Sequence, residues 1–216
     1  MTQKPSTATY ALLGLLGVQS WTGYELARQA HRSLRYIWPT SEAHLYREQK
    51  RLVRLGWATA TSESVGRRPR KRYAITDEGR AALEQWAVSE PQPPWFEVEG
   101  IVRVFFGDQA SVQSLEDSMR ATSRLARERL DDMLDFVDDY LETGGPFPER
   151  LHVVSIAVEV ITELLGTLDI FFGSTADEVA EWNTTKGRGL DGDTRNRLER
   201  VRARHPRSTT PREASQ

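Results

Sequence analysis

Apolar residues recur every three or four positions through most of the first 55 residues, a period that predicts helices rather than strands. Thr22 and Glu25 have the spacing of a capping box, so each can satisfy a free backbone N–H at a helix start. Thr40 or Ser41 can cap the next helix, and Gly56 can end it, because glycine takes the left-handed conformation at little steric cost. Three helices are therefore expected, over residues 7–16, 22–30 and 42–55.

Short stretches with strand character follow the third helix. Residues 57–64 alternate weakly between apolar and polar side chains, and residues 71–76 are the expected partner strand. Between them, five of the six residues from Arg67 to Arg72 are lysine or arginine. Thr76 then caps a fourth helix over residues 77–87, with acidic residues in its first turn.

A proline-rich stretch divides the chain. Three prolines within the four residues "PQPP" remove backbone donors and disfavour helix, which predicts an extended linker over residues 89–95. We expect one domain over residues 1–88 and a second over residues 96–185. Residues 186–216 lack apolar periodicity and are expected to be disordered.

The second domain has a helical period throughout. A short helix over residues 97–107, a long one over residues 112–142 and a third from about residue 149 are expected. The third helix carries two adjacent apolar stripes, an arc too wide for one neighbouring helix, so contact with a second chain is expected. The first stripe is Leu151, Val154, Val158, Ile161, Leu165, Leu168 and Phe172, and the second is Val153, Ala157, Val160, Leu164 and Phe171.

Composition removes several classes of function. The chain has 216 residues and no cysteine, which excludes disulfides, thiolate metal sites and cysteine nucleophiles. The histidines share no metal-ligand spacing with carboxylates, and no nucleophile stands beside a base, so no metal, cofactor or enzymatic activity is expected. The N-terminal residues lack the features of a signal peptide, and no apolar run is long enough to span a membrane, so a cytoplasmic location is expected.

Charge separates the two halves of the chain. Residues 1–88 hold 14 Lys and Arg against 7 Asp and Glu, a net charge of +7, whereas residues 89–216 hold 15 against 24, a net charge of −9. A basic first part attracts polyanions, of which nucleic acid is the usual one, and an acidic second part repels them.

The expected order of elements in residues 1–88 is helix, helix, helix, strand, strand, helix, with a charged loop between the strands. This is the plan of a winged helix-turn-helix domain, in which the third helix enters the major groove of DNA and the loop contacts phosphates or the minor groove. The fold class is therefore mainly α, with a winged helix-turn-helix domain followed by an all-helical domain.

The sequence also resembles the PadR family of bacterial transcriptional regulators. The matching stretches are "YALLGLL" at 10–16, "TGYELA" at 22–27, "LYREQKRLVRLGW" at 45–57 and "GRRPRKRYAITDEGRAAL" at 66–83. Residues 96–185 are similar to the dimerisation region of that family in architecture only. One position differs: Gln49 stands where the family usually has an apolar residue on the third helix.

The resemblance implies a homodimer that binds an inverted-repeat operator in double-stranded DNA and represses transcription until an effector releases it. It places base contacts at the start of the third helix, at Thr40, Ser41, His44 and Arg47. It places contacts with the DNA backbone at Lys50, Arg51, Arg67, Arg68, Arg70 and Lys71. The chemistry agrees, because an arginine fork such as Arg47 fits a guanine edge, whereas lysines and wing arginines neutralise phosphates without reading sequence.

Several alternatives stay open. Tyr46 can be the edge of the core rather than a DNA contact, and His44 can be merely exposed. Eight aromatic residues could line a cavity for a small apolar or aromatic effector where two subunits meet, although an ordinary core is the preferred explanation for them. They are Trp38, Trp95, Phe96, Phe105, Phe106, Phe171, Phe172 and Trp182. The rival function is a winged-helix module that binds proteins rather than DNA.

Overall fold

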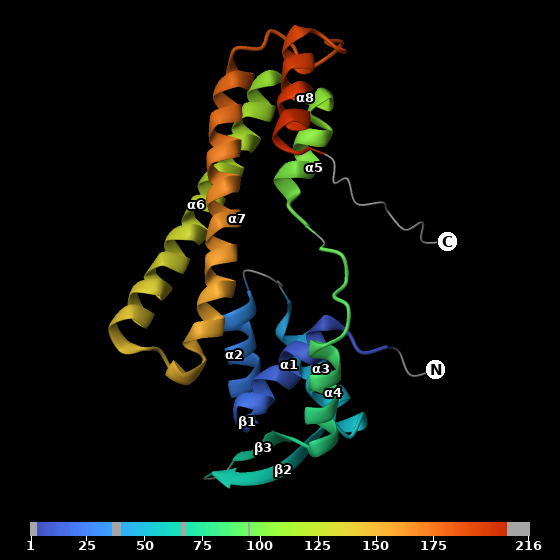
Figure 1. The fold of residues 1–216 in the computed structure, drawn as a ribbon, viewed down its shortest axis with the longest axis vertical. Helices are drawn as coiled ribbons and strands as arrows, with labels where there is room; N and C mark the ends of the chain where they lie inside the picture. The colour runs from blue at the N-terminus through green and yellow to red at the C-terminus, as the bar shows by residue number, and fades with distance from the viewer. Residues whose placement is uncertain (1–3, 36–39, 66–67, 95, 207–216) are drawn as a thin grey trace. The chain divides into compact units, whose positions relative to one another are not determined.

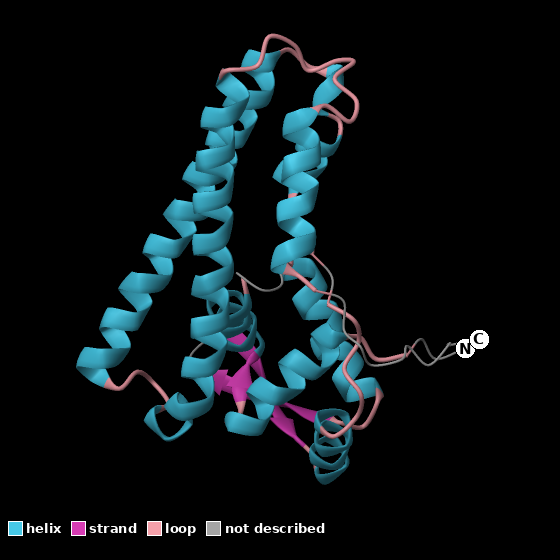
Figure 2. Cartoon of the chain, turned by 45° about the horizontal axis from the view of Figure 1, so that its top comes forward, coloured by secondary structure: helices cyan, strands magenta, loops and turns pink. Residues whose placement is uncertain are grey.

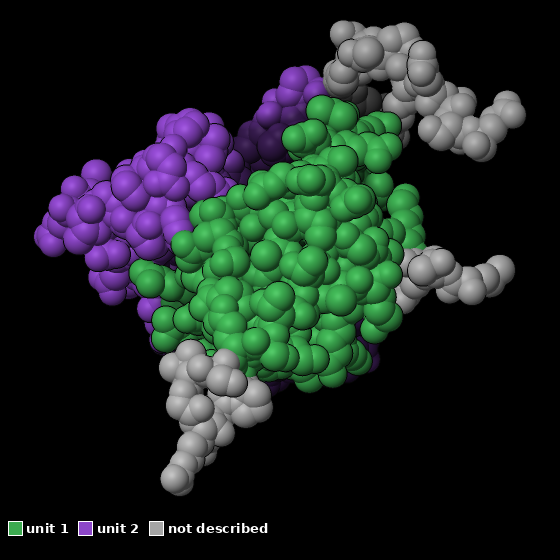
Figure 3. All heavy atoms as spheres, turned by 90° about the horizontal axis from the view of Figure 1, so that it is seen from below, with its two compact units in different colours: residues 1–95 green, residues 96–216 purple. Residues whose placement is uncertain are grey.

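The computed structural model describes residues 4–35, 40–65, 68–94 and 96–206. The chain divides into two compact units, residues 1–95 and residues 96–216, which Figure 3 colours separately. Figure 2 shows strands only in the first unit, and the second unit is helical over its described residues. The predicted class, mainly α with a winged helix-turn-helix domain and an all-helical domain, is confirmed.

The described residues of the first unit form four helices and a small sheet (Figure 1). The helices are α1 (Thr7–Val18), α2 (Gly23–Leu34), α3 (Glu42–Arg54) and α4 (Asp77–Ala87). The strands are β1 (Trp21–Thr22), β2 (Ala58–Val65) and β3 (Arg68–Ile75), in the order β1-β3-β2 with both pairs antiparallel. The sequence did not predict β1, because two residues are too short to show an alternating pattern.

Local signals begin and end these helices as expected. The predicted capping box at the start of α2 is present, with the Thr22 hydroxyl accepting from the Glu25 N–H and the Glu25 carboxylate accepting from the Thr22 N–H. Ser41, rather than Thr40, caps α3. Gly56 follows the end of α3 with a φ of 75°, the left-handed conformation that this helix end requires. Thr76 caps α4 by accepting from the Gly79 N–H.

A continuous core holds the first unit together. Leucines of three helices are fully buried in it, and Tyr73 of β3 closes it on the sheet side. Burying each such leucine contributes about 2 kcal/mol, so these contacts fix where α3 lies against α1, α2 and β3. The buried leucines are Leu12, Leu13, Leu16, Leu26, Leu45 and Leu52.

The second unit is built on two long helices, α6 (Val112–Thr143) and α7 (Leu151–Ala180), which lie side by side as a hairpin (Figure 1). The short helix α5 (Glu99–Phe105) and two 3-10 turns, Gly107–Gln109 and Pro148–Arg150, accompany them. The first predicted stripe of α7 is buried or half-buried, whereas every member of the second stripe is exposed. Only the first stripe is therefore covered within the chain, and the contact of the second stripe with another chain stays a prediction.

The expectation of disorder after residue 186 is wrong over part of that segment. Residues Gly192–Arg204 form the helix α8, capped by Asp191, whose carboxylate accepts from the Thr194 N–H at 2.8 Å. No residue of α8 is buried. Capping and ion pairs therefore hold this helix, and these signals are invisible to a search for apolar periodicity. Residues 207–216 lie outside the described residues.

Candidate nucleic-acid interface

The exposed face of α3 carries the residues expected to read bases. Arg47 is exposed, and its Nη2 lies 3.2 Å from Nδ1 of His44. A guanidinium can only donate, so His44 accepts through Nδ1, and this contact sets the direction of the arginine fork. Ser41 has a second role, because its hydroxyl accepts from the His44 N–H as the cap of the helix. Thr40 is half-buried beside this cap.

The opposite face of α3 is fixed by buried polar contacts. Glu48 is buried, and its Oε2 accepts a hydrogen bond from the Thr9 hydroxyl at 2.5 Å. Arg51 reaches Glu48 at 3.6 Å and donates to the Lys4 carbonyl at 2.8 Å. Arg51 therefore joins α3 to the segment before α1. The sequence predicts a phosphate contact at this residue as well. Lys50, the other cation predicted on this helix, is exposed.

Gln49 makes the link between α3 and α2. Its Nε2 donates to the Gly23 carbonyl at 2.8 Å, and the side chain is 1% exposed. The two helices approach closely here: a Cβ on Gly23 would lie 2.9 Å from Gln49 Oε1 and 3.2 Å from the ring of Tyr73, so a larger residue would displace the Gln49 amide. The polar side chain of Gln49 is thus accommodated in the core by a hydrogen bond to the backbone of α2.

The hairpin of β2 and β3 forms the wing, and it extends beyond the helices of the first unit (Figure 1). Arg70 and Lys71 are exposed on β3. Arg72 differs from them, because its Nε donates to Glu63 on β2 at 2.6 Å and its Nη1 donates to the Ser20 carbonyl at 3.3 Å. The hydrogen bond to Glu63 raises the pKa of Arg72. Gly66 and Arg67 lie outside the described residues, as does the side chain of Arg68.

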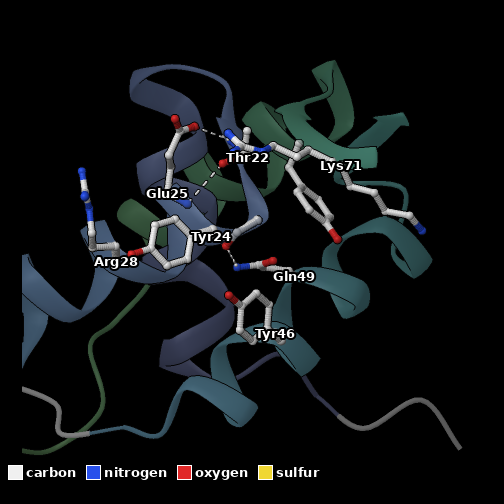
Figure 4. A pocket seen from close by; sticks show the side chains of 10 residues that line it. Thr22, Tyr24, Glu25, Arg28, Tyr46, Gln49 and Lys71 are labelled. Carbon is white, nitrogen blue, oxygen red and sulfur yellow. Dashed lines mark hydrogen bonds between the residues drawn. The ribbon is translucent and has the colours of Figure 1, made fainter. Parts of the chain in front are cut away.

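A surface hollow of about 500 Å³ joins the wing to α3. Tyr46 and Gln49 line it from α3, and Arg70, Lys71 and Tyr73 line it from β3. Figure 4 shows that the start of α2 completes the wall, through Thr22, Tyr24, Glu25 and Arg28. The sequence pattern assigned no binding role to Tyr24 or Arg28, because the hollow brings together segments that lie up to 51 residues apart in the chain. Tyr46 packs against the core, as the alternative reading of this residue predicted.

The second unit presents an apolar surface. Val160 is 54% exposed and Phe171 is 53% exposed, and both belong to the second stripe of α7. Phe105 and Phe106, at the end of α5, are exposed as well. Phe172, in contrast, is buried in the core of this unit with Trp182 packed against it. Trp38 and Trp95 lie outside the described residues.

Two other kinds of site find no support in the described part of the chain. No group of three or more His, Cys, Asp or Glu side chains there is placed to hold a metal ion. No helix among residues 4–35, 40–65, 68–94 and 96–206 combines the length and the apolar character needed to cross a bilayer.

Comparison with known proteins places the first unit in a sequence family. Residues 12–85 match the profile of the transcriptional regulator PadR-like family. A probable transcriptional regulator of Mycobacterium tuberculosis is 40% identical over 86 residues, which are 39% of this chain and 45% of that protein. The match thus spans less than half of that relative. The negative transcriptional regulator PadR of Bacillus subtilis is 24% identical over 139 residues, which are 63% of this chain and 76% of that protein.

Solved structures extend the likeness to both units. The crystal structure of Bacillus subtilis PadR in complex with operator DNA superposes with a TM-score of 0.68 at 21% identity, covering 81% of this chain and 99% of that one. The same protein in complex with p-coumaric acid gives a TM-score of 0.63 at 20% identity, covering 82% of this chain and 100% of that one. At this identity the likeness concerns the fold.

Proposed function

We propose that the chain, whose residues 12–85 match the transcriptional regulator PadR-like family, is a homodimeric repressor that binds an inverted-repeat operator. The observation that carries the proposal is the hollow that α3 and the wing share. A helix and a wing that border one concave surface can contact the same duplex, as winged helix-turn-helix domains do. We assign DNA binding to residues 1–88, the linker to residues 89–95 and dimerisation to residues 96–185.

The side chains divide into two roles. His44 and Arg47 contact base edges in the major groove, with Thr40 and Ser41 at the same end of α3. Lys50 and the wing cations Arg67, Arg68, Arg70 and Lys71 neutralise phosphates. Arg51 is proposed as a phosphate contact as well, and it also holds α3 against the segment before α1. This division supports a sequence-specific regulator, because reading and affinity come from different residues.

Dimerisation rests on the exposed second stripe of α7. A row of apolar side chains along one face of a long helix is typical of an interface between chains. The two DNA-binding domains of the dimer, here called heads, would be held at a fixed separation. Each would then meet one half of an inverted repeat whose halves lie one helical turn of DNA, or a multiple of it, apart. A small apolar or aromatic effector that changes this separation would release one half-site and most of the affinity. Bacillus subtilis PadR, whose structures carry operator DNA and p-coumaric acid, is consistent with both partners.

In this proposal the protein acts in the cytoplasm as a regulator, without a cofactor and without enzymatic activity. The experiment that tests it is a gel shift of the purified protein on the promoter region of its own gene, with footprinting of the retarded complex. We expect a retarded band and a protected inverted repeat. The alternative, a winged-helix module that binds only proteins, predicts no retarded band even at low salt.

A further inference from the structure

The hollow between α2, α3 and β3 is polar and cationic, and the division of roles above assigns nothing to two of its residues, Tyr24 and Arg28. Arg28 borders it on one side and Lys71 on the other (Figure 4). Arg70 adds a third cation from β3. The one carboxylate in the lining, that of Glu25, already accepts the Thr22 N–H at 2.9 Å, and this hydrogen bond lowers the pKa of Glu25. The lining therefore carries a net charge of +2 at neutral pH.

Three phenols accompany the cations. Tyr24 is 64% exposed, and the guanidinium carbon of Arg28 lies 5.9 Å from the centre of its ring. This contact holds the arginine against α2 at the rim of the hollow. Burial, and then the proximity of Tyr46, raises the pKa of Tyr73. A phenol with a raised pKa stays protonated at neutral pH and can donate a hydrogen bond to an anion.

One further feature of the wall favours an anion, and a second calls for a hydrogen-bond donor such as a water. The hollow lies at the start of α2, where the positive end of the helix dipole favours negative charge. Gln49 Oε1 is buried and has no hydrogen-bond partner among the described residues. This atom is an acceptor and needs a donor. A water that donates one hydrogen to Oε1 can donate its other hydrogen to an anion in the hollow.

We propose that this hollow binds a phosphodiester group of the DNA backbone, with Arg28 and Tyr24 as contacts of their own. The inference rests on the proposed function and extends it. The phosphate would lie between the part of the duplex that α3 reads and the part that the wing touches, because the walls of the hollow come from both elements. Arg28 and Tyr24 thereby become part of the surface that sets the register of the head on DNA.

The test compares Arg28→Gln with Arg80→Gln, which removes an exposed arginine of α4 outside the hollow. Fluorescence anisotropy on the operator and on an unrelated duplex, at several salt concentrations, measures affinity and its salt dependence. Losing one phosphate contact in each of two heads should reduce the log-log slope by about 2. Affinity at 0.1 M salt should then fall on the order of ten- to a hundredfold for both duplexes. Arg80→Gln should match the wild type, and thermal melting of both variants checks folding.

A neutral backbone substitution locates the contact. Single methylphosphonates placed along each half-site should include one position that weakens the wild type and has no further effect on Arg28→Gln. An unchanged salt slope for Arg28→Gln, or additive losses at every methylphosphonate position, would overturn the inference. Calorimetry with inorganic phosphate separates the other source of the same chemistry. Phosphate binding that Arg28→Gln abolishes, with DNA binding unchanged, would make the hollow a site for a free anion and overturn the inference as well. Failure of the wild type to bind any duplex would instead overturn the proposed function.

Discussion

The side-chain amide of Gln49 on α3 donates a hydrogen bond to the backbone carbonyl of Gly23 at the start of α2, at 2.8 Å. The bond is partly buried, and it joins the helix proposed to read DNA to the helix whose first turn borders the hollow. It accounts for a polar residue at a position where an apolar one is usual, because the amide replaces apolar packing with a fixed register between the two helices.

Substitution of Gln49 separates the value of its hydrogen bond from the value of its volume. Gln49→Met loses the bond to Gly23, worth about 1 kcal/mol, but also removes the unpaired acceptor Oε1, so the free energy of unfolding should change by less than about 1 kcal/mol. Gln49→Ala leaves a cavity as well and should lower it by about 2 kcal/mol or more. Urea unfolding measures both. Equal stability of Gln49→Ala and the wild type would show that the core does not depend on this side chain.

Arg47 should determine sequence preference. Arg47→Ala removes the fork expected on a guanine, so operator affinity should fall by about 1–3 kcal/mol while affinity for unrelated DNA changes less. Lys50→Ala is the matched control on the same helix, and it should weaken both duplexes equally. Competition binding with operator and scrambled duplexes checks the ratio. Equal losses on both duplexes for Arg47→Ala would assign Arg47 to the backbone instead.

The wing should contribute affinity without preference. Replacing Arg67, Arg68 and Arg70 with alanine removes six phosphate contacts per dimer, and the log-log salt slope should fall by about 5. All duplexes should be weakened alike, because phosphate contacts carry no sequence information. Filter binding from low to moderate salt measures the slope. Unchanged affinity at moderate salt would remove the wing from the mechanism.

The elements of the fold follow from the sequence where the signal is local. The capping residues Thr22 and Thr76 and the helix end at Gly56 could be predicted because each acts within a few residues of itself. The hydrogen bond from Arg51 to the Lys4 carbonyl could not, because the two residues lie 47 positions apart in the chain. The hollow could not be predicted either, because its walls come from segments that are far apart in the chain. Contacts between segments that are far apart in the chain produce no repeating pattern of apolar residues, so the sequence pattern cannot predict them.

Helix α8 could not be predicted from apolar periodicity, because none of its residues is buried. The capping residue of this helix makes its stability depend on pH. The Thr194 N–H and then the Arg188 guanidinium lower the pKa of Asp191 to about 2. A lowered pKa means that the cap stabilises the helix above the unfolded pKa of about 4, and that this contribution is lost as pH falls through about 2. Backbone chemical shifts of residues 192–204 should therefore stay helical to about pH 3 and then move toward coil.

Asp191→Ala should show frayed shifts over the first turn of α8 already at neutral pH, because the cap is missing in every protonation state. Glu199→Gln is the matched control, since it removes a carboxylate from the same helix without touching the cap. Wild-type shifts in Asp191→Ala would mean that the ion pairs Arg188–Asp193 and Arg197–Glu178 hold α8 without the cap.

The exposed stripe of α7 should decide whether the two heads act together. Val160→Asp places a carboxylate in the proposed interface, where burying an unpaired charge costs several kcal/mol, and should convert the dimer to a monomer. Val160 is 54% exposed within one chain, so the fold of each unit should survive the change. Glu159→Gln, on the neighbouring exposed face of the helix, should remain dimeric.

Sedimentation velocity gives the mass of each variant, and binding to full and half operators gives the consequence for function. A monomeric Val160→Asp should bind a half-site as the wild type does, yet bind the full operator no better than the half-site. The second head adds affinity only in a dimer, because the first bound head then keeps it close to the other half-site. Dimerisation fixes the effective concentration of the second head at that half-site. A Val160→Asp variant that still sediments as a dimer would place the interface elsewhere in the second unit. A monomer that keeps full operator affinity would separate DNA recognition from pairing altogether.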